Sequence, residues 1–360
     1  MRCELDGVEQ WWSGDCLDVP FPGRMAFFVG AGISIAGPTY LPDGKSLTVA
    51  LVNHLLGKSA AEEILSTFKK CSEVIGRDTP RLEHVLDIAC KSEVTGGADP
   101  KSLLSLFANR SYNSNHRHLA AFLAEKKSWV ITTNFDDCIE RAYFDNYGCE
   151  LPVHVVCPES GAIDSGQSLG HQPWGLVKLH GSITQGVSGL GATLSNLVPG
   201  LHPELRNLLS RIFQTIDLLV VAGYSGSDHF DVNAWFRERM GASDRPPRLL
   251  WINHSSKTND ELEWDDSREP GRSWHLAMSG SRIVSGHTDR FLCDLMGVTS
   301  GYSEEDSSIE AALPLAKALE MLYCPSEEQR YSCSHPGRMY SGRVELTPIW
   351  VCLCLMACLF

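Results

Sequence analysis

Short, largely apolar runs recur along the middle of this 360-residue chain, and each is followed by a polar turn. Such runs indicate strands that are buried on both faces of a sheet. Segments with helical periodicity separate them, so we predict an α/β fold with a Rossmann-like parallel sheet and helices on both faces. The clearest runs are residues 26–29, 129–133, 176–179, 216–222 and 249–252, with weaker ones at 153–156 and 283–284.

A helical insertion is predicted after the first strand, over residues 46–107. Leu47, Leu51 and Leu55 recur every four residues there, which is typical of one helix face. The predicted domain organisation is an N-terminal segment 1–24, a binding domain 25–298 that contains the insertion, and a C-terminal extension 299–360 with no recognisable pattern. The extension ends in an apolar tail, 349–360, which we expect to be disordered or in contact with another surface.

Charge and cysteine spacing limit the classes of partner. The net charge of −13 disfavours direct binding of nucleic acid or of an anionic membrane. The 13 cysteines include no C-x-x-C pair, which disfavours a zinc ribbon and favours free thiols in a reducing cytosol. No run resembles a signal peptide or approaches the roughly 20 apolar residues of a spanning helix, so we expect a cytoplasmic protein.

Polar residues follow the predicted strands directly. Ligands of open parallel sheets bind beyond the carboxyl ends of the strands, so these residues are the candidate site. Each also has a structural interpretation: the glycines as a plain turn, Asp136 as a helix cap, and His180 as a buried structural histidine. The residues concerned are the turn Gly30-Ala31-Gly32 with Ser34, then Asn134 and Asp136, His180, the loop Gly223 to Asp228 with Ser225, and Asn253.

Two other kinds of site receive less support. The glycine turn lacks the third glycine of a G-x-G-x-x-G fingerprint, because Ile35 stands there, which disfavours a dehydrogenase. Several histidines raise the question of a metal, but neither Cys nor carboxylates accompany them at ligand spacing, so no metal site is predicted. These histidines are His116, His118, His229 and His254.

Taken together, the motifs resemble the sirtuin-like NAD-binding family over residues 25–298. Gly30 to Ser34 is similar to that family's G-A-G-x-S loop, and Thr133-Asn134-Phe135-Asp136 and His180-Gly181 are similar to its central segments. Leu41-Pro42-Asp43 resembles the segment that closes over nicotinamide. The chain lacks the paired zinc cysteines of sirtuin deacylases and has Thr132-Thr133 where they show Thr-Gln. In both respects it is similar to bacterial sirtuin-like NAD hydrolases of antiphage defence.

The resemblance implies a substrate, NAD, and a role for each candidate residue. His180 would act as base, Asn134 would orient water or ribose, and Asp136 would stabilise charge or hold its loop. The pyrophosphate would be bound by Gly30, Ala31, Gly32 and Ser34, the nicotinamide side by Asp43, and the adenosine side by Gly223, Ser225 and Asn253. It further implies a regulated defence effector that forms a homo-oligomer, with an ATPase or an Argonaute-type protein as a possible partner. The competing interpretations are an NAD or ADP-ribose sensor without turnover, and a protein deacylase or ADP-ribosyltransferase.

Overall fold

The computed structural model describes most of the chain between residues 25 and 292, in two compact units. Of the described residues, the first unit takes those of 25–41, 107–191 and 197–292, and the second those of 42–106 and 192–196. The predictions for 1–24, 299–360 and His229 lie outside the described residues. The residues that the structure describes are 25–75, 78–91, 100–108, 110–156, 163–164, 174–226, 228, 231–242, 247–254, 263–264, 282–286, 288–289 and 291–292.

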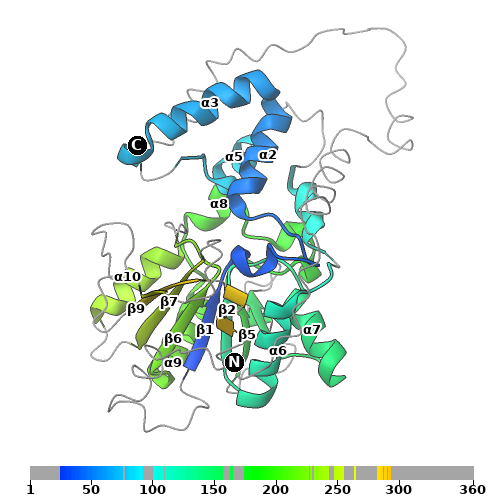
Figure 1. The fold of residues 1–360 in the computed structure, drawn as a ribbon, viewed down its shortest axis with the longest axis vertical. Coiled ribbons are helices and arrows are strands. Elements are labelled where there is room, and N and C mark those ends of the chain that lie inside the picture. Colours follow the sequence, from blue (N-terminus) through cyan, green and yellow to red (C-terminus); the bar gives the residue numbers. More distant parts are fainter. Residues whose placement is uncertain are drawn as a thin grey trace. The chain divides into compact units, whose positions relative to one another are not determined.

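The first unit is built on a sheet whose strand order, over the described residues, is β4-β3-β5-β2-β1-β6-β7-β9-β8. Figure 1 labels its central strands and β9. All neighbouring strands from β3 to β9 run parallel, and only β4 and β8 add antiparallel edges. The predicted Rossmann-like parallel sheet is thereby confirmed. The strands are β1 Met25–Val29, β2 Trp129–Thr132, β3 Val153–Val156, β4 Ile163–Asp164, β5 Gly175–Lys178, β6 Leu218–Ala222, β7 Arg248–His254, β8 Glu263–Trp264 and β9 Arg282–Gly286.

Strand β1 lies at the point where the strand order reverses. Its last residue, Val29, pairs with Thr132 of β2 on one side and with Ala222 of β6 on the other. Strand β5 pairs with β2 in turn, as far as Thr132 and Lys178. The loops that follow β1, β2, β5 and β6 therefore begin side by side at one edge, where open parallel sheets bind ligands.

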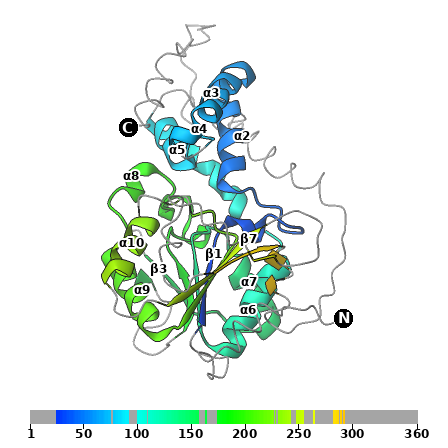
Figure 2. The same ribbon diagram turned by 60° about the vertical axis from the view of Figure 1, so that its left-hand side comes forward.

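Helices cover both faces of this sheet (Figures 1 and 2). Alternate side chains of β1 pack against the helices on opposite faces. Phe27 packs on one face with α6 and α7, where its ring meets Phe122 with centroids 4.7 Å apart. Phe28 packs on the other face with α9 and α10, and its ring centroid lies 5.5 Å from that of Phe236. The four helices are α6 Ser114–Lys126, α7 Cys138–Tyr147, α9 Pro203–Thr215 and α10 Val232–Ala242.

The second unit is helical, which confirms the predicted helical insertion after the first strand. Leu47 and Leu51 are fully buried in its first helix, as their spacing predicts, and Gly57 ends that helix with a φ of +75°. In the described residues no helix is long and apolar enough to cross a membrane. The elements of the insertion are α2 Gly44–Leu56, α3 Lys58–Lys70, α4 Ser72–Ile75, α5 Leu82–Lys91 and η3 Pro100–Phe107; the remaining short helices are η1 Ala31–Ser34, η4 Ile183–Gln185, η5 Val187–Gly189 and α8 Leu194–Leu197.

Candidate functional site

The glycine turn after β1 packs directly on the turn after β6. Gly32 N–H donates to the carbonyl oxygen of Gly223 at 2.8 Å, and Gly30 N–H donates to that of Ala222 at 3.1 Å. A Cβ on Gly32 would lie 2.7 Å from the Cα of Gly223, closer than real Cβ contacts come. Gly223 itself has a φ of +61°, which favours glycine. The glycines are thus required for two backbones to touch.

This packing bears on the predicted binding of pyrophosphate. Because the amides of Gly30 and Gly32 donate to carbonyl oxygens of β6 and its turn, they are already engaged within the protein. Ala31 lies between them, half-buried at the start of η1. Phosphate binding by this turn stays a prediction, and the closeness of the β1 and β6 loops is what the structure establishes.

Three of the predicted site residues form one buried hydrogen-bonded group. Ser34 Oγ donates to Asp136 Oδ2 at 3.1 Å, and Asn134 Nδ2 donates to Ser34 Oγ at 3.3 Å. The same Asn134 amide also donates to the carbonyl oxygen of Gly30 at 3.3 Å. All three residues are buried. Ser34 therefore connects the turn after β1 to the segment after β2.

His116 of α6 completes this group, a role that its position in the sequence did not reveal. Its Nδ1 accepts from the backbone N–H of Asn113 at 3.1 Å, within a capping box that starts α6. The neutral ring then carries its proton on Nε2, which donates to Ser34 Oγ at 3.0 Å. Burial lowers the pKa of His116 to about 4, although the negative charge of Asp136 opposes that shift. The ring is thus neutral at pH 7, and the hydrogen bonds run in one direction, from Asn113 through His116 and Ser34 to Asp136.

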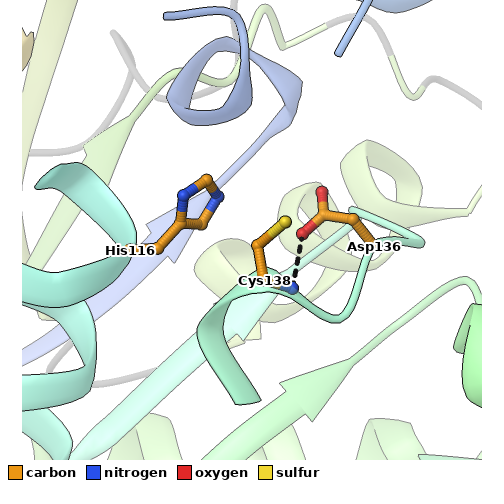
Figure 3. A group of neighbouring side chains, drawn as sticks. All are labelled: His116, Asp136 and Cys138. Atoms are coloured by element: carbon orange, nitrogen blue, oxygen red, sulfur yellow. Dashed lines mark hydrogen bonds between the residues drawn. The ribbon is translucent and has the colours of Figure 1, made fainter. Parts of the chain in front are cut away.

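Figure 3 shows that His116, Asp136 and Cys138 converge from α6, the loop after β2 and the start of α7. One potential ligand atom from each lies within 4.8 Å of the others, so the three could be considered metal ligands. Both ring nitrogens of His116 and both oxygens of Asp136 already have partners in the protein. Burial and the neighbouring Asp136 raise the pKa of the Cys138 thiol, which disfavours the thiolate that metals bind. A metal would have to displace Ser34, and the predicted absence of one stays a prediction.

His180 follows β5 and pairs with Asp231, just before α10. The distance from His180 Nε2 to Asp231 Oδ2 is 2.9 Å, and both side chains are buried. Burial alone would raise the pKa of Asp231, but the charge of His180, its hydrogen bond and backbone amides lower it below its ordinary value. Gly181 has a φ of +87°, and its missing Cβ admits the carbonyl oxygen of Gly189. No pattern around Asp231 distinguishes it in the sequence, apart from its place after a polar loop.

The segments that carry Asn134 and His180 also touch each other. Ile183 N–H donates to the carbonyl oxygen of Phe135 at 2.9 Å. The ring centroids of Phe135 and His180 lie 6.5 Å apart, with Phe135 half-buried. The segments that follow β2 and β5 are therefore in direct contact next to these two predicted catalytic residues.

The remaining predicted residues lie further along the sheet edge or in the second unit. Asn233 Nδ2 donates to the carbonyl oxygen of Gly226 at 2.6 Å, which anchors the loop after β6 to α10, while Ser225 of that loop is exposed. Asn253 is exposed near the end of β7. Asp43 belongs to the second unit, where it caps α2 by accepting from Ser46 N–H at 2.7 Å. Ligand contacts of Asp43, Ser225 and Asn253 stay predictions.

Comparison with known proteins gives this arrangement a family context. Residues 128–269 match the SIR2-like domain model. The matched stretch runs from the start of β2 past β7 and contains Asn134, Asp136, His180 and Asp231. It supports a sirtuin-like family and is consistent with NAD binding, whereas the glycine turn and the helical insertion precede it. No curated protein matches the chain.

Proposed function

We propose that this protein hydrolyses NAD at the bond between nicotinamide and ribose. The observation that carries the proposal is the place of Asn134 and His180 at the carboxyl ends of the paired strands β2 and β5. Asn134 is hydrogen-bonded to the glycine turn of β1, so the three sequence motifs meet at the reversal point of the sheet. The match to a SIR2-like domain supports NAD as the ligand of such a site.

Asp231 determines which nitrogen of His180 can act as base. When Asp231 Oδ2 accepts the proton of Nε2, the neutral imidazole has its lone pair on Nδ1. In the proposed step His180 takes a proton from water through Nδ1, and the water oxygen bonds to the ribose carbon that releases nicotinamide. The pyridinium nitrogen keeps the electron pair of the broken bond, so nicotinamide leaves neutral. The products are nicotinamide, ADP-ribose and one proton.

The hydrogen-bonded group around Ser34 gives Asn134 and Asp136 distinct roles. Asn134 has its amide nitrogen fixed by Gly30 and Ser34, so it can orient water or ribose with little loss of side-chain entropy. Asp136 accepts from Ser34 Oγ with one oxygen and from Cys138 N–H with the other. This favours the role of holding the loop over direct stabilisation of charge on the ribose.

The biological setting is a further part of the proposal. The resemblance to antiphage NAD hydrolases supports a defence effector that stays inactive until it assembles with itself or with an ATPase or Argonaute-type partner. Such control is expected on physical grounds, because continuous hydrolysis would deplete the cell of NAD. Within the part of the chain that the structure describes, Cys71, Cys90, Cys138 and Cys149 form no disulfide, which fits the proposed reducing compartment, the cytosol.

Turnover in water labelled with ¹⁸O tests the reaction class. Purified protein, alone and concentrated enough to assemble, is incubated with NAD, and nicotinamide and ADP-ribose are separated and weighed by mass spectrometry. We expect equal amounts of both products, with one labelled oxygen in ADP-ribose. Binding of NAD without any product, under all conditions, would support the sensor instead. Product formation only with an acylated lysine peptide would support a deacylase.

A further inference from the structure

A charged lysine lies fully buried between the two predicted catalytic segments. Lys178 is the last residue of β5, two positions before His180, and its side chain is 0% exposed. Its ammonium group has oxygen partners in three separate segments. These are the carbonyl oxygens of Phe135 (3.4 Å) and Asp136, Ser182 Oγ (3.1 Å) and Glu140 Oε1 (2.8 Å).

Stability alone does not account for this ion pair, in which the Lys178 side chain is fully buried and the Glu140 side chain is 17% exposed. Removing an ammonium and a carboxylate from water costs several kcal/mol for each ion, and apolar residues of similar size often serve stability as well or better. Burial raises the pKa of Glu140, and the charge and hydrogen bond of Lys178 oppose that rise. The charges are therefore compensated by the hydrogen bonds that the Lys178 ammonium group donates, and the same hydrogen bonds connect the segments after β2 and β5 and the first turn of α7.

The position of Lys178 explains what it connects. The pairing of β2 with β5 reaches only as far as Thr132 and Lys178, and the catalytic segments begin beyond it. Lys178 extends the connection through its side chain, to the loop that contains Asn134 on one side and to Ser182, just after His180, on the other. Glu140 adds a link to the first turn of α7.

We propose that Lys178 is a positioning residue for the cleavage of NAD: it fixes the segment of Asn134 relative to the segment of His180. This inference rests on the proposed function, and Lys178 acts through its neighbours rather than on the substrate. A small displacement of catalytic groups lowers turnover far more than it lowers binding. Loss of Lys178 should therefore change kcat and leave the KM for NAD nearly unchanged.

The test is the double variant K178M/E140Q, which removes both charges and leaves no unpaired buried charge. We expect its melting temperature to stay close to that of the wild type, its kcat to fall about 10- to 100-fold, and its KM to change less than about threefold. The matched control is K45M/D78N, which removes an ion pair of the same kind, 2.6 Å long but half exposed, in the second unit. That control should keep wild-type kcat.

Hydrogen exchange supplies a measurement that does not depend on activity. Leu179 N–H donates to Thr132 O and Ile183 N–H to Phe135 O, so these two amides report on the contact between the segments. In K178M/E140Q we expect both to exchange at least about tenfold faster, while amides of β6 stay unchanged. Unchanged exchange, or a fall in kcat no larger than the fall in folded protein, would overturn the inference. A wild type that never releases nicotinamide would refute the proposed function, and exchange alone would then decide whether Lys178 holds the segments.

Discussion

The neutral, buried His116 should make the stability of the first unit depend on pH. The pKa of this ring is lowered from 6.5 to about 4 by burial, so the unfolded chain takes up a proton near pH 6.5 and the folded chain does so only near pH 4. Between these values the unfolded state binds more protons, and the free energy of unfolding falls as the pH falls. A shift of about 2.5 units corresponds to about 3 kcal/mol, of which about 2 kcal/mol is lost by pH 5.

The variant H116N isolates this contribution, because an asparagine oxygen can still accept from Asn113 N–H but the side chain does not titrate. Urea unfolding of both proteins at about pH 7.5 and about pH 5 gives the loss of stability on acidification. We expect that loss to be about 2 kcal/mol smaller in H116N than in the wild type. In H54N, which removes a histidine that is only half-buried, it should stay near that of the wild type. Equal losses in wild type and H116N, within about 0.5 kcal/mol, would refute a neutral His116.

Two further substitutions test the contacts around the site. G32A places a Cβ against the backbone of the turn after β6, so it should destabilise the first unit by about 1–3 kcal/mol in thermal or urea unfolding. G44A, where a Cβ meets nothing within 4 Å, should not destabilise the protein, and equal effects of the two would contradict the packing argument. D231N should lower kcat about tenfold or more, because an amide can donate to Nε2 of His180 and move the ring proton to Nδ1. Its control is D145N, on the exposed face of α7, which should keep wild-type kcat. A wild-type kcat in D231N would show that Asp231 does not orient the base.

The sheet could be predicted because its central strands are apolar enough to be recognised from their own sequence, without knowledge of the strands that pair with them. Residues of β1 and β6 are buried on both faces, and their sequences are correspondingly apolar throughout. The start of helix α6 at Ser114 is defined by a capping box of Asn113 and His116, which an apolar pattern does not reveal. The edge strands β4 and β8 are two residues long, too short for any periodicity, and only pairing with a neighbour defines them.

Of the candidate site, only the residues that follow the ends of strands could be predicted from the sequence. Asn134 and His180 directly follow strands, and topology alone brings the ends of neighbouring strands together. His116 and Asp231 join the site through contacts with residues 82 and 51 positions away in the sequence, for which no local signal exists. The glycine turn shows the same limit, since its packing against Gly223 cannot be distinguished by sequence from a phosphate-binding loop.

Nicotinamide release by paired variants shows whether Asn134 and His180 carry the proposed reaction. N134A and H180A are compared with N146A and H54A, which remove the same residue types from α7 and from the second unit. With NAD in excess and circular dichroism confirming the fold of each protein, we expect nicotinamide release by N134A and H180A to fall about 100-fold or more. The two control variants should match the wild type. Wild-type release by H180A or by N134A would contradict the assignment of the reaction to this edge of the sheet.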